Sequence, residues 1–344
     1  MKVLVLAGWI AGLVSIAPAQ SPTQRWYRGN THTHTLNSDG DTPAAEVVRW
    51  YRTHGYQFLF VTDHEYVTDV APLNQLYGAP GRFVTLSAQE VTQRTADATH
   101  PDGVRQAHLN ALGISTVIRP LGERNIANQS IAATYTRNIA EIRKQNGVAQ
   151  INHPNFRWSV KLDEMLELPD STLLEIWNGH SDVNNLGGTD STGAAYPSHE
   201  AVWDSLLTRG KVIFGVADDD SHHFKPEDAD NPDLTRPGRG WVMVHADTLT
   251  RDAIVGALRR GGFYATTGVT LKSYSASARE VQLEITPRGD TRYRIEFIGT
   301  GGRVLQSISG LRGRYAPTGD EGYVRVRVSD SNGRRLWTQP VFLR

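Results

Sequence analysis

The chain has 344 residues, of which 36 are Lys or Arg, 36 are Asp or Glu, 12 are His and none is Cys. The formal net charge of zero disfavours a nucleic-acid or membrane-surface binder, because such proteins use a basic excess to neutralise phosphates. The lack of cysteine excludes disulfides, zinc-thiolate sites and thiol nucleophiles. A length typical of about two domains and 39% hydrophobic residues predict a sizeable core. The histidines are therefore the chemically informative residues.

Residues 1–19 have the pattern of a cleavable signal peptide. Lys2 precedes residues 3–17, which carry no charge, and Ala17-Pro18-Ala19 is a small-x-small cleavage pattern. The uncharged run is shorter than the about 20 apolar residues that a transmembrane helix needs. We therefore predict a periplasmic or secreted protein without a stable membrane anchor; an uncleaved anchor or a buried strand is the alternative.

Residues 20–270 are predicted to form one α/β domain. From Arg28 onward, short apolar runs alternate with stretches whose apolar residues recur every three or four positions, which is typical of β-α units and a mainly parallel sheet. Thr42 is expected to cap the first helix and Gly55 to end it. Further helices are expected at residues 137–145, 201–209 and 252–260. Strands are expected at residues 29–34, 58–62, 83–88, 108–113, 148–151, 173–177 and 212–217.

Two loop-like regions and a change of pattern follow. Residues 183–196 and 225–240 are rich in loop-forming residues and are predicted to be either binding loops or tolerated insertions. Residues 271–344 alternate apolar and polar residues in short runs, which predicts a small C-terminal antiparallel β domain. Packing against the first domain is its simplest role, and binding of a glycan or a partner is the alternative.

Side chains that commonly bind metals gather where the predicted strands end. His32 and His34 form a His-x-His pair, and on an extended segment this spacing points both imidazoles to one side. The full candidate set is His32, His34, Asp39, His64, Glu90, His108, His153, Asp220 and His222. Because the carboxyl ends of barrel strands meet at one mouth, we expect these residues to share a site. Imidazole and carboxylate without thiolate suit zinc, manganese or iron, and this many ligands predict two or three ions.

The run Asp218-Asp219-Asp220 leaves a choice of register, and we favour Asp220 because the Asp-x-His spacing to His222 repeats the geometry of the first pair. His54 precedes the glycine that ends the first helix and is interpreted as a helix cap. His199 and His245 are interpreted as ordinary structural residues.

The candidate positions resemble the motifs of the polymerase and histidinol phosphatase (PHP) superfamily. The segments that carry the resemblance are Thr31-His32-Thr33-His34-Thr35 with Ser38-Asp39-Gly40, Thr62-Asp63-His64, Glu90, His108-Leu109-Asn110-Ala111-Leu112-Gly113, Asn152-His153-Pro154 and Asp220-Ser221-His222. Over residues 28–268 the chain looks most like the CehA/McbA branch, named after carbaryl-hydrolysing metallohydrolases. The resemblance implies a distorted (β/α)7 TIM-like barrel, the PHP fold, with a trinuclear metal centre.

The resemblance also implies how the ligands divide among the ions. One ion would be held by His32, His34, Glu90 and Asp220. A second would take Glu90 as a bridge together with His108 and His153. The third would take Asp39, His64 and His222.

These features predict an exported metal-dependent phosphoesterase. There is no serine in a Gly-x-Ser-x-Gly elbow, and a multinuclear centre that activates water and neutralises developing charge suits phosphomonoesters or small phosphodiesters. His180 and His223 are candidates for the general acid or a phosphate contact. Candidate substrate contacts are Arg94, Lys225 and Arg239. The alternatives are a carbamate, ester or amide hydrolase using the same centre, and a non-catalytic binding protein stabilised by metal. We expect a small anionic or ester substrate and no nucleic-acid polymer.

Overall fold

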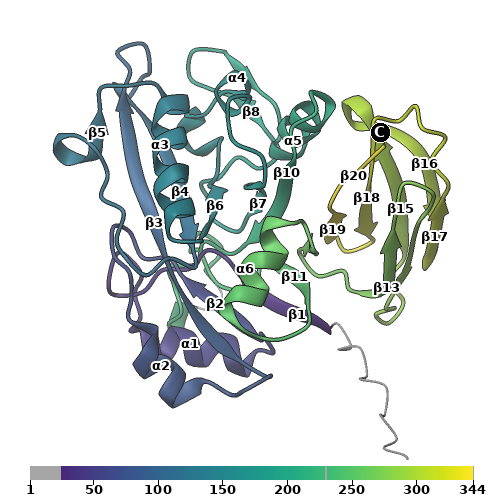
Figure 1. Cartoon of the computed structure of the whole chain (residues 1–344), viewed down its shortest axis with the longest axis horizontal. Coiled ribbons are helices and arrows are strands. Elements are labelled where there is room, and N and C mark those ends of the chain that lie inside the picture. The colour runs from purple at the N-terminus through teal and green to yellow at the C-terminus, as the bar shows by residue number, and fades with distance from the viewer. Residues whose placement is uncertain (1–24, 229–230, 344) are drawn as a thin grey trace, which may run out of the picture.

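The computed structural model describes residues 25–228 and 231–343, so the predicted signal peptide lies outside the described residues. Within this part of the chain no helix has both the length and the apolar composition needed to cross a membrane. The chain forms a mixed α/β structure in which helices flank a large sheet and the C-terminal strands lie to one side (Figure 1).

Residues 25–246 build a mixed sheet with the strand order β10-β7-β6-β4-β3-β2-β1-β11. Its strands are β1 (Arg25–Asn30), β2 (Phe58–Val61), β3 (Val84–Ala96), β4 (Val104–Leu112), β6 (Val148–Ile151), β7 (Thr172–Asn178), β10 (Ile213–Asp218) and β11 (Trp241–Ala246). The strands β1, β2 and β3 pair in parallel, as do β6, β7 and β10. In contrast, β4 runs antiparallel to both β3 and β6. The mainly parallel sheet predicted from the sequence is therefore wrong around β4, because residues 97–103 are too few for a crossover and close a hairpin instead.

The predicted closed seven-stranded barrel is not observed among the described residues. The hydrogen-bonded path is open, with β10 at one end. The segments that follow β1 and β10 nevertheless meet at an isolated parallel bridge between Thr33 and Ser221, where the His34 N–H donates to the Ser221 carbonyl at 2.9 Å. This bridge brings the polar segments that follow β1 and β10 side by side, which is what the metal-ligand candidates require.

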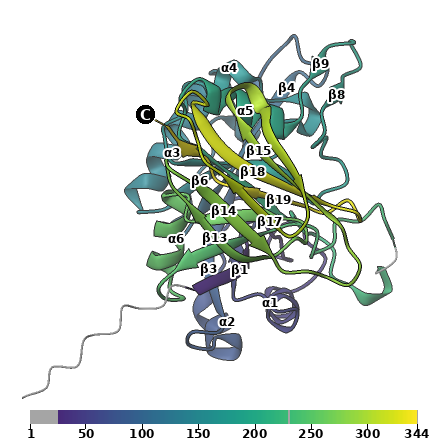
Figure 2. The same ribbon diagram turned by 90° about the vertical axis from the view of Figure 1, so that its right-hand side faces the viewer.

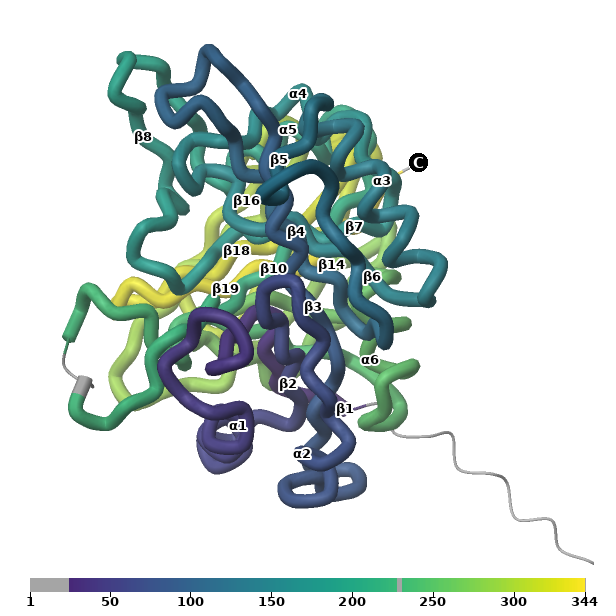
Figure 3. Tube along the Cα trace, turned by 90° about the vertical axis from the view of Figure 1, so that its left-hand side faces the viewer, coloured from purple at the N-terminus to yellow at the C-terminus, as the bar shows by residue number. Residues whose placement is uncertain are grey.

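The described residues form six α-helices: α1 (Ala44–Thr53), α2 (Val70–Tyr77), α3 (Ile131–Lys144), α4 (Leu162–Met165), α5 (His199–Thr208) and α6 (Arg251–Arg259). Figure 1 and Figure 3 both place α1 and α2 at one end of the molecule and α4 and α5 at the other. In α1, the apolar spacing buries Val47, Val48 and Tyr51 as predicted. Thr42 does not cap this helix: the N-cap is Pro43, which offers no side-chain acceptor, and the Thr42 hydroxyl donates to Asp41 at 2.6 Å.

The loops between these elements contain short pieces of regular structure. These are β5 (Ile126–Ala127), β8 (Gly188–Thr189), β9 (Ala195–Tyr196) and the 3-10 turns Glu123–Asn125, Phe156–Trp158, Pro226–Asp228 and Thr300–Gly302. The region predicted as irregular at residues 183–196 thus contains a small hairpin of β8 and β9.

The C-terminal strands all pair antiparallel, as their alternating pattern predicts. They are β12 (Phe263–Thr266), β13 (Leu271–Ala276), β14 (Val281–Ile285), β15 (Tyr293–Gly299), β16 (Arg303–Ser309), β17 (Arg312–Tyr315), β18 (Tyr323–Asp330), β19 (Arg335–Thr338) and β20 (Val341–Phe342). Figure 2 looks onto these strands. They share one apolar core, but β19 pairs with β12 and so continues the main sheet. A separate domain beginning at residue 271 therefore remains a prediction.

A buried ion cluster joins the C-terminal strands to α5. The fully buried Arg325 on β18 donates to Asp204 at 2.7 and 2.8 Å and to Glu200 at 2.8 Å. The Tyr323 hydroxyl also donates to Asp204, at 2.8 Å. Because each buried charge here has a partner, this cluster fixes the C-terminal strands against α5.

Candidate metal centre

The structure brings the nine predicted ligands together in three adjoining groups. They come from the loop after β1 (His32, His34, Asp39), the segment after β2 (His64), β3 (Glu90), β4 (His108), the turn after β6 (His153) and the segment after β10 (Asp220, His222). One of these positions differs from the expectation. Glu90 lies inside β3 rather than at a strand end, because the β3–β4 hairpin extends beyond the site, whereas His108 lies on its strand as expected.

The first group contains His32, His34, Glu90 and Asp220, all buried. The Nε2 atom of His32 lies 3.1 Å from an oxygen of Glu90 and 3.1 Å from an oxygen of Asp220, and the Nε2 atom of His34 lies 3.2 Å from the same two oxygens. Four ligands about 2.0 Å from one ion would lie about 3.3 Å apart in a tetrahedron. The spacing of these atoms thus matches the edges of a tetrahedral metal site.

The Nε2 atom of His34 gives a second test of the fit. It is buried and makes no hydrogen bond with the described residues, although the two carboxylate oxygens lie 3.2 Å away. A buried polar atom without a partner is costly unless something else satisfies it. An ion between the imidazoles and the carboxylates would satisfy it, and so the donor set fits a metal.

The second group uses the other oxygen of Glu90. This oxygen lies 3.1 Å from Nδ1 of His108 and 3.4 Å from Nε2 of His153. Glu90 therefore presents one oxygen to each of two ligand groups, which is the arrangement of a carboxylate that bridges two ions.

The third group is the most open. One oxygen of Asp39 lies 3.4 Å from Nε2 of His64 and the other lies 3.4 Å from Nε2 of His222, with His34 alongside. The Nδ1–H of His222 donates to the Asp220 carbonyl at 2.9 Å, which leaves its Nε2 as the free ligand atom. The Asp39 side chain is 56% exposed, so solvent and substrate can reach this group.

Several buried side chains of the centre have pKa values that are shifted towards their charged forms, although burial favours the neutral forms. Burial alone would raise the pKa of Glu90, but His64 and His32 hold it well below its usual value. The pKa of Asp220 is held well below its usual value in the same way, against burial, by His32 and His34. Burial opposes protonation of His64, yet Glu90 and Asp39 raise its pKa to about 9. The buried carboxylates are thus ionised and need nearby positive charge.

Glu175 on β7 supports the centre and was not predicted from the sequence. One of its oxygens accepts hydrogen bonds from Nδ1 of His32 at 2.7 Å and from Gln150 at 3.1 Å. The other accepts from the His153 backbone N–H at 2.6 Å and from Asn178 at 2.9 Å. A carboxylate that holds the outer nitrogen of a ligand histidine fixes the ring and its tautomer. In the sequence, this position differs from its neighbours only in being the single charged residue inside the apolar run of residues 173–177.

The structure also separates the three consecutive aspartates. Asp219 accepts hydrogen bonds from the backbone N–H groups of Arg239 and Gly240 at 2.7 and 2.9 Å. Asp218 accepts from Gln150 at 2.9 Å. Asp220, the residue favoured from the sequence, is the one whose oxygen lies between the imidazoles of the first group.

Two of the candidate ligands have a strained backbone. Asp220 has φ of +47° and His153 has φ of +26°, which are conformations that residues other than glycine rarely adopt. Such strain persists only where surrounding contacts hold it, and it concentrates at functional sites.

The two candidate acid residues lie near the open third group. The His180 ring centroid is 5.5 Å from that of His222, and its Nδ1 accepts a hydrogen bond from the Asp182 N–H at 3.1 Å. Burial lowers the pKa of His180. The His223 ring lies 6.3 Å from that of His222, and its Nδ1 is buried without a hydrogen bond to the described residues.

The three candidate anion contacts are placed differently. Arg239 donates to the backbone carbonyls of Gly179 at 3.0 Å and Leu234 at 2.8 Å, so its guanidinium holds two loops together. Arg94 donates to the Arg124 carbonyl, and Lys225 is exposed. Among the described residues, none of the three makes a hydrogen bond or an ion pair with a candidate metal ligand.

No protein-family model matches the chain, and no curated protein sequence matches it. One similar solved structure is a two-domain protein from Bacteroides vulgatus containing a predicted PHP-like metal-dependent phosphoesterase: it is 16% identical, the match covers 89% of this chain and 90% of that one, and the TM-score is 0.48. Another is an amidohydrolase from Chromobacterium violaceum, 15% identical over 60% of this chain and 90% of that one, with a TM-score of 0.36. A third is an endonuclease/exonuclease/phosphatase from Beutenbergia cavernae, 13% identical over 91% of this chain and 100% of that one, with a TM-score of 0.27.

The first of these structures carries the name of the superfamily that the sequence motifs resemble, and none of the three names the CehA/McbA branch. All three TM-scores are below 0.5, and we therefore infer the function from the geometry of the candidate centre.

Proposed function

We propose that the chain is a metal-dependent hydrolase whose centre holds two or three divalent ions, of zinc, manganese or iron. The observation that carries this proposal is the placement of Glu90, whose two oxygens face two different groups of histidines. Imidazole and carboxylate ligands without thiolate suit these metals. Two of the ligand groups implied by the motif resemblance coincide with groups in the structure, and the third is contained in a group that also includes His34.

The protein's own residues would position the metal ligands and handle protons. When bound, the ions would lower the pKa of a water molecule to about 7 and offset negative charge on the substrate. Glu175 holds His32 and the backbone of His153 in place. His180 lies beside the open third group, and burial lowers its pKa, so it is suited to exchange a proton with a leaving group or to contact the substrate.

The substrate class we favour is a phosphomonoester or a small phosphodiester. An exposed edge at Asp39 gives small molecules access, and a cluster of divalent ions would attract an anionic substrate. A carbamate, ester or amide is the second candidate, since the same chemistry serves it. The names of the similar structures include both a phosphoesterase and an amidohydrolase and do not decide between them. We also propose that the signal peptide directs export and that the protein acts in the periplasm or outside the cell.

The test compares substrates and matched variants. Purified protein supplied with zinc, manganese or iron is assayed against p-nitrophenyl phosphate, its bis-ester and a naphthyl carbamate. We expect turnover of a phosphate ester, loss of turnover in Glu90→Gln, and retention in Glu141→Gln, which changes a partly exposed carboxylate paired with Lys144 in the same way. Turnover of the carbamate alone would select the second candidate. No turnover of any substrate with any of the metals would contradict the proposed function.

A further inference from the structure

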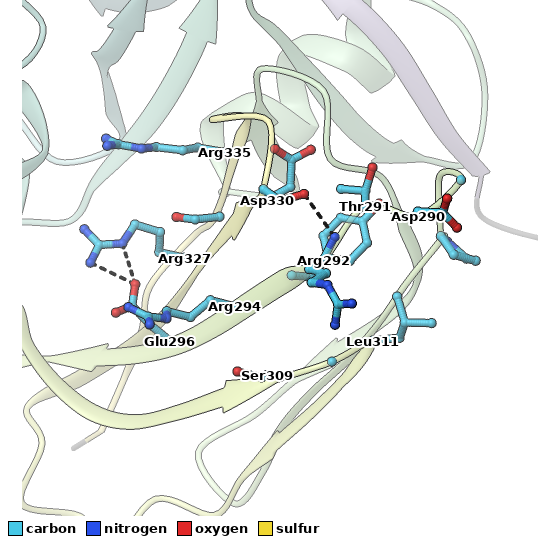
Figure 4. Close-up of a pocket in the computed structure, with 16 residues that line it drawn as sticks. Asp290, Thr291, Arg292, Arg294, Glu296, Ser309, Leu311, Arg327, Asp330 and Arg335 are labelled. Carbon is cyan, nitrogen blue, oxygen red and sulfur yellow. Dashed lines mark hydrogen bonds and ion pairs between the residues drawn. The ribbon is translucent and has the colours of Figure 1, made fainter.

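A groove on the C-terminal strands, distant in sequence from the metal ligands, has the features of a second binding site. Its volume is about 1250 Å³, and its walls come from β15, β16, β18, β19 and the adjoining turns (Figure 4). Pockets for small molecules usually measure about 300–1000 Å³. The size therefore favours an extended ligand over a small metabolite.

The pairing register places basic and hydroxyl side chains in one row across four strands. Ser309 pairs with Arg294, Arg294 pairs with Ser329, and Ser329 pairs with Arg335. Directly paired residues share a face of a sheet, and neighbouring strands lie about 4.8 Å apart. The two arginines of this row are therefore about 10 Å apart, with a serine beside each of them.

The positive charge of this row is not neutralised within the described residues. The carboxylate of Glu296 is already paired with Arg327 at 2.9 Å, and Arg327 also reaches Glu200 of α5 at 3.2 Å. No carboxylate of the described chain lies within ion-pair distance of the guanidinium groups of Arg292, Arg294 or Arg335. Figure 4 shows all three lining the groove together with the Glu296–Arg327 pair.

The remaining lining is rich in hydroxyl groups rather than apolar side chains. Thr291, Ser309, Ser329 and Ser331 line the groove, and Leu311 supplies an apolar contact. Two further carboxylates, Asp290 and Asp330, also line it, and Asp330 accepts hydrogen bonds from the backbone N–H groups of Asn332 and Arg334 at 2.8 and 2.9 Å. Guanidinium groups bind carboxylates, sulfates or phosphates in a fork of two hydrogen bonds, and hydroxyl groups exchange hydrogen bonds with the hydroxyls of sugars. We propose that this groove binds an anionic oligosaccharide, with Arg294 and Arg335 contacting acidic groups on separate sugar units.

The experiment measures binding of labelled oligosaccharides to the full chain by fluorescence anisotropy at low salt. The probes are an oligogalacturonate, which carries carboxylates, a sulfated oligosaccharide, and neutral dextran of similar length. The variant Arg294→Ser with Arg335→Ser removes the free charges of the row. The matched control is Arg279→Ser with Arg303→Ser, which removes two exposed arginines outside the groove lining.

We expect at least one acidic oligosaccharide to bind, dextran not to bind, and the groove variant to lose at least tenfold in affinity while the control keeps it. The relative affinities of the carboxylated and sulfated probes identify the acidic group. Esterase activity and the unfolding midpoint of the groove variant should stay at the level of the control, which separates this site from the metal centre. Three results would overturn the proposal: no binding of either acidic probe, equal weakening by both double variants, or equally tight binding of single-stranded DNA of the same charge.

Discussion

Replacing Glu175 with Gln tests whether the metal centre depends on residues that do not contact the ions. Glu175 accepts four hydrogen bonds, two on each oxygen. Glutamine keeps the shape of the side chain but replaces one acceptor oxygen with an NH2 group, which is a donor. In one orientation this NH2 group faces the donors of His32 and Gln150, and in the other it faces those of His153 and Asn178. A buried donor left without an acceptor costs about 1–3 kcal/mol.

That cost predicts a definite loss of metal affinity. At about 1.4 kcal/mol per factor of ten, 1–3 kcal/mol corresponds to roughly 5- to 150-fold weaker binding of the ion held by His32. This range overlaps the about 10- to 100-fold loss of metal affinity that is typical when a carboxylate hydrogen-bonded to a metal ligand is removed. Affinity is measured by competition with a fluorescent chelator, with Glu141→Gln as the matched control. An affinity of Glu175→Gln equal to that of the wild type would refute the reasoning, because Glu175 would then not orient His32.

Two further predictions concern stability. Arg325→Met leaves the carboxylates of Asp204 and Glu200 without their buried partner, so the free energy of unfolding measured in urea should fall by about 3–5 kcal/mol. A loss below about 1 kcal/mol would mean that the cluster does not hold the C-terminal strands. Burial lowers the pKa of His199 to about 3, so below about pH 6.5 the unfolded chain takes up a proton that the folded protein does not. The folded protein therefore loses stability as the pH falls, and His199 accounts for about 2 kcal/mol of this loss at pH 5. Between pH 7 and pH 5, the free energy of unfolding of metal-free His199→Gln should fall by about 2 kcal/mol less than that of the metal-free wild type. Equal losses in the two proteins would contradict this assignment.

The sequence predicts the candidate ligands better than it predicts the sheet that carries them. His32, His34, His153 and His222 are polar residues at the boundaries of apolar runs, and this local pattern needs no knowledge of strand direction. The direction of β4 depends on the length of the preceding connection and on which neighbour it pairs with, and an apolar run looks the same in either direction. The predicted mainly parallel sheet is wrong at β4 for this reason.

Other features depend on contacts between distant segments and leave little trace in the sequence. Glu175 appears only as one charge in an apolar strand, and its role follows from its contact with His32, 143 residues away. His199 was expected to be ordinary, and it is fully buried, where its Nε2 accepts a hydrogen bond from the Asn155 N–H at 3.1 Å. The row of Arg294 and Arg335 exists only because β18 lies between their strands.

The number of bound metal ions tests the central proposal most directly. Protein reconstituted with manganese or zinc, freed of excess ion and measured by elemental analysis should contain two to three ions per chain. Glu90→Gln, which alters the carboxylate shared by two ligand groups, should lower this number by at least one, and Glu141→Gln should leave it unchanged. One ion or fewer per wild-type chain, or an unchanged number in Glu90→Gln, would contradict a multinuclear centre built around Glu90.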